Sequence, residues 1–393
     1  MDVKKLLLKE NASLELKEVA RHIIKSKKCV VITGAGISVS GGIPDFRSKD
    51  GGLYEMVKKQ FPGTICGKDL FDNELIKSNE ALKAFNVFMG TLKELIGSAV
   101  PTPTHVFLKK FAEMNKLTRI YTQNIDDLEQ RIGLNADWKI EKVSKCATQV
   151  VQLHGTMSRL KCCRCTKEYP FTTEYCGIFK SGEAPLCPNC ESREETRVKQ
   201  GRRPHPVGKL IPMVLLYGDE HPNGVEIGQL SAHDQSRADC LLIMGTSLKI
   251  PGVKALIKNF ARAVHDRNGH VIMVNKSDVI RREWNGIIDY QVEGDCDEWI
   301  KIVEGELAEG AKSFRRRIKI PREHLGQIGE CTCQKHKNEM SGYPWNVKSK
   351  QGLDCQSGGF RLVIGLRFLN SILVLDSLRV GMAILDFELS SAD

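Results

Sequence analysis

The chain has 393 residues and a formal net charge of +10 at pH 7, with 41% hydrophobic and 27% charged residues. This length allows two or three domains, or one large α/β domain with insertions. The composition is that of a globular protein, no stretch of about eighteen residues is free of charge, and no membrane span is therefore predicted.

The amino-terminal segment MDVKKLLLKENASLELKEVARHI (1–23) is the first predicted element. It lacks the apolar core and the cleavage site of a signal peptide, and its mixed charges predict a helix. The chain contains 14 cysteines, which would stay reduced in a protein that is not secreted. Metal ligation is therefore favoured over disulfide bonds. The excess of basic residues favours acidic partners such as nucleic acid or chromatin, although many enzymes are also basic.

Short apolar runs that stop at small polar residues predict the strands of a parallel sheet. They are KCVVIT (28–33), RIYTQNID (119–126), VVQLHG (150–155), MVLLYG (213–218), CLLIMGTS (240–247) and HVIMVN (270–275). Segments with helical periodicity, such as NFARAVHDRNG (259–269), separate several of them. This alternation predicts an α/β fold with a parallel sheet covered by helices on both faces. Ligands of such sheets bind at the carboxyl ends of the strands.

Two segments interrupt the alternation. Residues 51–100 have helical character, whereas residues 156–210 are polar, rich in cysteine and poor in periodicity, and both predict insertions that form a smaller lobe. The predicted organisation is a main α/β domain at residues 1–50, 101–155 and 211–305, a helical insertion at 51–100, a zinc-binding module at 156–210, and a basic linker with a carboxyl-terminal extension at 306–393.

Two C-x-x-C pairs separated by roughly twenty residues predict a zinc site. The ligands would be Cys162, Cys165, Cys187 and Cys190. A tight turn lets both sulfurs of a pair reach one ion, and four protein ligands leave no position open for catalysis, so the zinc would be structural. Cys163 and Cys176 lie nearby but do not give the C-x-x-C spacing.

The glycine-rich segment ITGAGISVSGGIPDFR (32–47) follows the first predicted strand. Gly34 and Gly36 permit close approach of a phosphate group to the backbone. The dinucleotide fingerprint G-x-G-x-x-G is not met, because Val39 stands at the third glycine. A generic glycine turn would explain the two glycines but not the continuation into GIPDFR.

Polar residues also follow two later strands. In TQNIDDLE (122–129), Gln123 and Asn124 can hydrogen-bond sugar or amide groups, and Asp126 can accept from a carboxamide. Asn124 and Asp126 are equally good helix-capping residues, so a structural role stays open. His154 ends another predicted strand, where a structural role and that of a general base near neutral pH both fit.

In their order along the chain, these motifs resemble the sirtuins. The motifs are GAGIS (34–38), GIPDFR (42–47), TQNID (122–126), LHG (153–155), the paired C-x-x-C site, YGDE (217–220), GTSL (245–248), VN (274–275) and GDCDE (294–298). Each motif is modest alone, but their ordered occurrence is specific. The resemblance covers roughly residues 15–305 and is greatest to the fungal Hst-type nuclear histone deacetylases.

The resemblance implies a Rossmann-like sheet with helices on both faces and a smaller lobe made of the zinc module and the helical insertion. It implies an NAD-dependent protein-lysine deacetylase that consumes NAD and yields nicotinamide and O-acetyl-ADP-ribose. His154 would activate a ribose hydroxyl after the acyl-lysine oxygen has attacked the carbon that bears nicotinamide. Asn124 and Asp126 would line the nicotinamide pocket and, with His154, form the catalytic set.

The resemblance also implies the cofactor and peptide contacts. Those to NAD would be Gly34, Ala35, Gly36, Ser38, Asp45, Phe46, Arg47, Gln123, Asn124, Ile125, Asp126, Gly245, Thr246, Ser247, Asn275 and Cys296. Phe46 would shield the reacting ribose, and Cys296 would lie against the adenine edge, where a packing role alone also suffices. Leu216, Tyr217 and Gly218 would pair with an extended acyl-lysine peptide.

The family pattern leaves some points open. Tyr217 stands where phenylalanine is common and Asp219 where glutamate is common, which bears on acyl-chain preference rather than on activity. The favoured partner is an acetylated histone in the nucleus, with chromatin association, and the cytoplasm is the alternative location. No membrane partner is expected. Protein mono-ADP-ribosyl transfer and a non-catalytic chromatin-binding module are the alternative functions.

Three features of the last part of the chain are left unassigned. Cys331-x-Cys333-x-x-His336 lacks a clear fourth metal ligand. The basic run FRRRIKIPR (314–322) fits a nucleic-acid contact, a nuclear import signal or a solvated linker. The apolar segment at 361–393 has no counterpart in the family.

Overall fold

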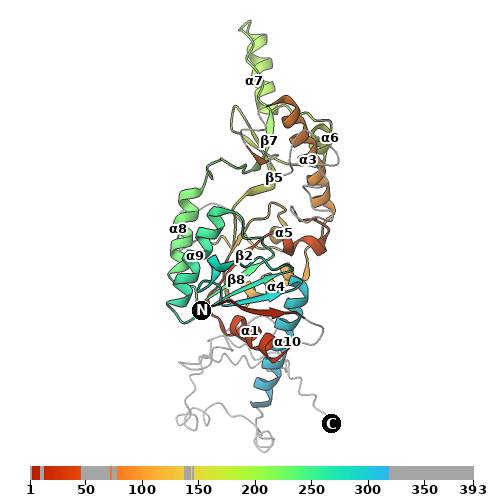
Figure 1. The fold of residues 1–393 in the computed structure, drawn as a ribbon. Coiled ribbons are helices and arrows are strands. Elements are labelled where there is room, and N and C mark those ends of the chain that lie inside the picture. The colour runs from red at the N-terminus through yellow and green to blue at the C-terminus, as the bar shows by residue number, and fades with distance from the viewer. Residues whose placement is uncertain are drawn as a thin grey trace, which may run out of the picture. The chain divides into compact units, whose positions relative to one another are not determined.

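The computed structural model describes residues 2–8, 13–45, 71–72, 78–136, 143 and 146–317 (Figure 1). Met1–Leu307 form one unit by their contacts, and Ala308–Asp393 form another. The unassigned features at 331–336 and 361–393 lie outside the described residues, as does the basic run beyond residue 317. Among the described residues, no helix combines the length and apolar character needed to span a bilayer.

The main sheet has seven strands, in the order β1-β10-β9-β8-β2-β3-β4, and all its neighbouring pairs are parallel. The strands are β1 (Lys4–Leu7), β2 (Cys29–Thr33), β3 (Leu117–Thr122), β4 (Val150–Gln152), β8 (Cys240–Met244), β9 (His270–Asn275) and β10 (Tyr290–Glu293). Every residue of the central strands β2 and β8 is buried, because both faces of the sheet are covered.

Helices cover the two faces of this sheet. One face packs on α1 (Leu14–Lys25), α4 (Pro103–Glu113) and α10 (Cys296–Arg317), and the other on α8 (Gly224–Gln235) and α9 (Pro251–His265), as Figure 1 shows. Alternate residues of β2 belong to different cores: Val31 packs with the first set of helices, whereas Val30 and Ile32 pack with the second. The period of two along a strand therefore separates the cores.

A second, three-stranded antiparallel sheet has the order β6-β5-β7. Its strands are β5 (Gly155–Cys162), β6 (Glu168–Pro170) and β7 (Leu210–Val214). With it lie α3 (Asn79–Ser98), α6 (Thr173–Lys180) and α7 (Pro188–Lys199). The apolar core shared by α3, α6 and the sheet includes Phe85, Met89, Leu160 and Phe179. The short elements are η1 (Ala35–Ile37), η2 (Val39–Gly41), α5 (Leu128–Arg131) and η6 (Arg282–Trp284).

The predicted α/β class, with a parallel sheet and helices on both faces, is confirmed, but two of the predicted elements are wrong. The amino-terminal segment contains a strand at Lys4–Leu7, and its helix begins only at Leu14. The run at 213–218 is not a strand of the parallel sheet: Met213 and Val214 end β7, which pairs antiparallel with β5. The sequence missed β1 because its four residues are mostly exposed, as is usual for a charged edge strand.

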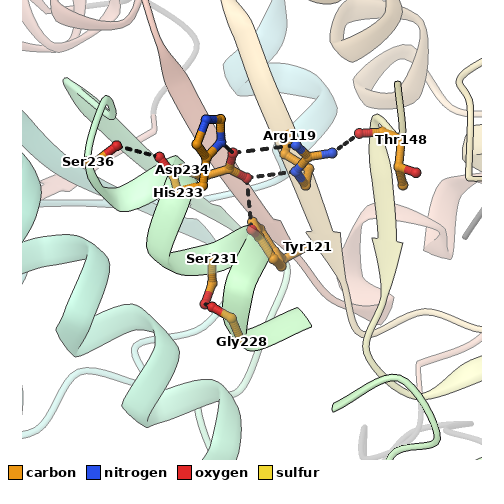
Figure 2. Close-up of polar contacts among 8 residues, drawn as sticks. All are labelled: Arg119, Tyr121, Thr148, Gly228, Ser231, His233, Asp234 and Ser236. Carbon is orange, nitrogen blue, oxygen red and sulfur yellow. Dashed lines mark hydrogen bonds and ion pairs between the residues drawn. The ribbon is translucent and has the colours of Figure 1, made fainter. Parts of the chain in front are cut away.

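A buried ion pair ties α8 to the main sheet (Figure 2). Arg119 of β3 donates through Nε to a carboxylate oxygen of Asp234 on α8 at 2.7 Å, and the Tyr121 hydroxyl donates to the same oxygen at 2.8 Å. The guanidinium also donates to the carbonyl of Thr148. Both charged side chains are nearly inaccessible, with exposed fractions of 4% and 0%. Removing one partner of such a pair costs about 3–5 kcal/mol, because the other charge is left buried and unpaired.

Candidate active site

A cleft of about 1240 Å³ lies where β2, β3, β8 and β9 end. Of the residues predicted to contact NAD, twelve line it: Gly34, Ala35, Gly36, Asp45, Gln123, Asn124, Ile125, Gly245, Thr246, Ser247, Asn275 and Cys296. Ser38 and Asp126 are buried behind its wall, while Phe46 and Arg47 lie outside the described residues. Residues from six separate motifs therefore meet at the carboxyl edge of the sheet, where parallel α/β folds bind ligands.

Two glycine turns form the floor of this cleft. The Gly36 amide donates to the Gly245 carbonyl at 2.9 Å, and the Gly245 amide donates to the Val274 carbonyl at 3.0 Å. A Cβ atom on Gly36 would lie 2.7 Å from the Gly245 Cα atom, closer than side chains come to backbone. Gly245 itself has φ +62°, a conformation that favours glycine. The two turns thus require glycine for their mutual packing, and both line the cleft.

Gln123 joins the turns that follow three strands. Its Nε2 atom donates to the Thr33 carbonyl at 3.2 Å and to the Thr246 hydroxyl at 2.9 Å. Its backbone amide donates to the same Thr33 carbonyl at 2.9 Å. The side chain predicted to contact a ribose therefore also fixes the edge of the cleft.

His154 follows β4 and lines the same cleft. Its Nδ1 atom lies 2.9 Å from the Gln123 carbonyl oxygen. A carbonyl can only accept, so Nδ1 carries the hydrogen and Nε2 is the basic nitrogen of the neutral ring. The next residue, Gly155, has φ +83°, and a Cβ atom there would lie 2.1 Å from the Met213 carbonyl oxygen. The backbone and the Gln123 carbonyl together hold the ring in the form that a general base needs.

A chain of hydrogen bonds leads from the cleft into the protein. The Asn124 Nδ2 atom donates to the Ser38 hydroxyl at 3.1 Å, and that hydroxyl donates to an Asp126 carboxylate oxygen at 2.8 Å. The other oxygen of Asp126 accepts from the Leu128 amide at 3.1 Å. Burial raises the pKa of Asp126 above its usual value, although these two hydrogen bonds oppose the effect.

The predicted peptide-binding residues Leu216, Tyr217 and Gly218 line the cleft beyond the end of β7. The Leu215 amide donates to the His154 carbonyl at 3.0 Å, which places this segment beside the candidate base. The Tyr217 amide donates to the Phe71 carbonyl at 2.5 Å. One backbone edge at Tyr217 is therefore paired with a segment of the chain itself, a contact that the sequence did not predict.

His221 is a cleft residue that the sequence analysis missed. Its Nδ1 atom accepts from the Asn223 amide at 3.0 Å, so Nε2 carries the hydrogen and donates to the Gln152 carbonyl at 3.2 Å. Burial lowers the pKa of His221. The ring therefore fastens the loop after residue 218 to β4. Its position directly after the YGDE motif (217–220) was the available signal.

The four predicted zinc ligands come together. Each sulfur of the first C-x-x-C pair lies close to one sulfur of the second pair. The Cys162 and Cys190 sulfurs lie 3.7 Å apart, and the Cys165 and Cys187 sulfurs lie 3.6 Å apart. All four sulfur atoms lie within 4.8 Å of one another. A tetrahedral zinc ion with Zn–S bonds of about 2.3 Å requires sulfur separations of about 3.8 Å, so the arrangement fits zinc.

The neighbouring cysteines do not belong to this cluster. The exposed Cys163 accepts from the Lys209 amide at 3.3 Å, and the Cys176 thiol donates to the Thr172 carbonyl at 3.8 Å. The Arg164 and Cys165 amides both donate to the Cys162 sulfur at 3.4 Å, as amides next to a metal-bound thiolate do. Four sulfur ligands give a closed site, which is suited to holding structure rather than to catalysis.

Comparisons with known proteins agree with this fold and site. A model of the Sir2 family matches residues 34–252. The NAD-dependent histone deacetylase HST3 of Saccharomyces cerevisiae is 37% identical, with 91% of this chain and 83% of that protein covered. HST3 of Candida albicans is 40% identical, with 81% and 67% covered. The NAD-dependent protein deacetylase hst4 of Schizosaccharomyces pombe is 37% identical, with 72% and 68% covered.

Solved structures show the same fold. A chain from a study of the mechanism and regulation of Sir2 enzymes has a TM-score of 0.55 and 25% identity, with 76% of this chain and 99% of that chain covered. A complex of a Sir2 homologue with NAD has a TM-score of 0.55 and 20% identity, with 77% and 97% covered. The resemblance that the ordered motifs suggested is confirmed: the chain belongs to the Sir2 family.

Proposed function

We propose that the protein is an NAD-dependent protein-lysine deacetylase that acts on histones in the nucleus. The observation that carries the proposal is the geometry of His154 in the cleft. Its Nδ1 atom donates to the Gln123 carbonyl, so Nε2 is the basic nitrogen, and two glycine turns form the floor of the same cleft. The names of the fungal relatives, which are histone and protein deacetylases, support the choice of reaction and substrate.

In the proposed reaction, NAD is a substrate. The glycine turns at Gly34–Gly36 and Gly245 receive its phosphates, while Asn124 positions the nicotinamide carboxamide and Asp126 acts on Asn124 through Ser38. The acetyl-lysine oxygen attacks the ribose carbon that bears nicotinamide, and nicotinamide leaves with the bonding electrons. His154 then accepts the proton of a ribose hydroxyl, which attacks the acetyl carbon. Hydrolytic breakdown of that adduct yields the free lysine and O-acetyl-ADP-ribose.

The remaining assignments are part of the same proposal. The peptide would lie along 216–218, and the adenosine end of NAD would lie near Asn275 and Cys296. Phe46 would shield the reacting ribose, and Asp45 and Arg47 would belong to the cofactor loop. A structural zinc ion would be held by the four-cysteine cluster. The main domain would comprise residues 1–50, 101–155 and 211–305. The helical insertion would be 51–100, the zinc module 156–210 and the terminal extension 306–393.

The test is nicotinamide release measured with the full chain, NAD and acetylated or unmodified histone peptides, with nucleosomes included. Release that depends on both NAD and the acetyl group is expected. With NAD labelled in its ADP-ribose part, the label is expected in a small product. Label bound covalently to protein would replace the proposal with mono-ADP-ribosyl transfer, and chromatin binding without nicotinamide release would replace it with a non-catalytic module.

Replacing Gly36 by Ala is expected to weaken NAD binding by about tenfold or more, which corresponds to about 1.4 kcal/mol. The new Cβ atom would lie 2.7 Å from the Gly245 Cα atom and push the two turns apart. Calorimetric titration with NAD measures the effect. Gly97→Ala on α3 is the matched control, because no heavy atom lies within 4 Å of a Cβ there. Equal NAD affinities for the two variants would contradict the role of the turns.

A further inference from the structure

Three titratable side chains meet beneath the cleft: His105 of α4, Asp126 after β3, and Glu129 of α5. Their exposed fractions are 0%, 4% and 1%. The nitrogen or oxygen atoms that they offer lie within 4.8 Å of one another. We call them the buried trio. The proposed reaction gives Asp126 a role but leaves His105 and Glu129 without one.

Two polar atoms of the buried trio lack a hydrogen-bond partner among the described residues, namely His105 Nε2 and Glu129 Oε1. His105 Nδ1 lies 3.2 Å from the Thr102 backbone amide and 2.8 Å from the Thr102 hydroxyl, which donates to the Ile37 carbonyl. Burial lowers the pKa of His105 to about 4, so the ring is neutral near pH 7 and supplies no cation to the two carboxyl groups.

The charged groups around the buried trio do not neutralise its carboxyls. Asp127 accepts from Thr156 at 2.6 Å and from Gln152 at 2.6 Å. Arg131 donates to the carbonyls of Ile96 and Ala99. The charge of Lys93 lowers the pKa of Asp127, and its ammonium group donates to the Met157 carbonyl. The charge of Asp297 raises the pKa of His105, and its carboxylate accepts from the Thr104 amide. Among the residues that the structure describes, neither Asp126 nor Glu129 forms an ion pair.

Two adjacent carboxyls that are buried without a cation cannot both be ionised, so the pair must hold a proton. Asp126 accepts hydrogen bonds from the Ser38 hydroxyl and the Leu128 amide, and both stabilise its anion. The Glu129 carboxyl also receives hydrogen bonds, from Thr122 and from its own backbone, but its Oε1 atom accepts none. Burial raises the pKa of both carboxyls, and that of Glu129 rises further, with the charge of Asp126 as the second cause.

We propose that Glu129 holds the proton of this pair, so that Asp126 stays ionised and sets the direction of the hydrogen-bond chain that ends at Asn124 in the cleft. Glu129 is thus a positioning residue. The role of this hydrogen-bond chain in binding nicotinamide rests on the proposed function. The location of the proton on Glu129 does not.

The direction of the chain decides what the cleft offers to a ligand. With Asp126 ionised, the Ser38 hydroxyl donates to it across 2.8 Å and accepts from the Asn124 amide group across 3.1 Å. With Asp126 protonated on the oxygen that faces it, the Ser38 hydroxyl accepts from Asp126 and its hydrogen loses that acceptor; Asn124 can receive the hydrogen only when its amide group turns over. Donor and acceptor would then exchange places at the wall of the cleft, and a carboxamide ligand such as nicotinamide would meet the wrong pattern.

A divalent metal ion in the buried trio is the competing explanation. It would bind the lone pair of His105 Nε2 and both carboxylates, and it would leave no proton on Glu129. Metal analysis of the wild type and of Glu129→Gln distinguishes a metal ion from a proton.

The experiment measures nicotinamide binding by calorimetry from acid to alkaline pH for the full chain and two variants. Glu129→Gln keeps a neutral donor and is expected to bind like the wild type near neutral pH, whereas Glu129→Ala is expected to bind about tenfold more weakly. Wild-type affinity should fall at low pH, where Asp126 gains a proton, and again at high pH, where Glu129 loses its proton. The alkaline fall should be absent from Glu129→Gln, because an amide has no such proton.

A second readout does not depend on binding or activity. The infrared difference between wild type and Glu129→Gln, both without ligand at neutral pH, should contain the carbonyl-stretch band of a protonated carboxylic acid. Glu113→Gln, an exposed change on α4, is the control and should show no such band. A missing band, a persistent alkaline fall in Glu129→Gln, or a second metal ion lost with Glu129 would each overturn the proposal. Absence of nicotinamide release by the wild type would instead overturn the proposed function and leave the infrared result standing.

Discussion

Replacing His154 by Ala is expected to lower deacetylation turnover by about 10²–10⁴-fold, the usual contribution of a general base. The ring lines the cleft, and the hydrogen bond from Nδ1 to the Gln123 carbonyl leaves the basic lone pair on Nε2. The glycine turns are held together by their own backbone hydrogen bonds, so NAD affinity is expected to change little. Nicotinamide release and peptide deacetylation should be measured together with NAD binding.

The matched control is His205→Ala in the exposed segment after α7, where turnover should equal that of the wild type. An unchanged rate in His154→Ala would refute the assignment of the base. A loss of NAD binding that parallels the loss of turnover would also contradict it, because it would place His154 in cofactor binding instead.

Removal of zinc is the second large expected effect. Structural zinc sites contribute apparent binding free energies of about 10–16 kcal/mol near pH 7, which are coupled to folding. The polar helix α7 contains no buried residue, and its first residues lie between the two ligands of the second pair. A chelator is therefore expected to unfold β5–β7 and α7 and to abolish turnover, and added zinc should restore both.

Two cysteine variants sharpen this test. Cys187→Ser, at a fully buried sulfur of the cluster, is expected to lose zinc, with a clear fall in melting temperature. Cys163→Ser, one residue from a ligand but exposed and outside the cluster, should keep one zinc ion and the wild-type melting temperature. Metal analysis by mass spectrometry and circular dichroism measure both properties. Full activity of a zinc-free protein would refute a structural role for the ion.

Much of the candidate site could be predicted because its residues follow strands. Glycines, amides and small hydroxyls after β2, β3 and β8 must meet at one edge of a parallel sheet, and the order of the motifs identified that edge. The cysteine cluster was equally accessible, since the spacing within each pair fixes how the sulfurs meet.

Other features depend on contacts that no local pattern records. The apolar run at 213–218 resembles a buried parallel strand, yet its partner is β5. Only Pro212 signals an edge strand, because proline has no N–H group to donate to a neighbouring strand. Phe71 meets Tyr217 across a long separation in sequence. In the sequence, Glu129 looks like an ordinary acidic residue in the first turn of a helix. Only the tertiary structure reveals that it is buried beside Asp126.

The ion pair between Arg119 and Asp234 constrains how this sequence can change over time. A lineage that loses either partner first passes through a protein with an unpaired buried charge, whereas replacing both by apolar residues can leave stability unchanged. The shared hydroxyl of Tyr121 adds a third position that would have to change with them. The three positions are therefore expected to covary: a substitution at one of them should be accompanied by substitutions at the other two.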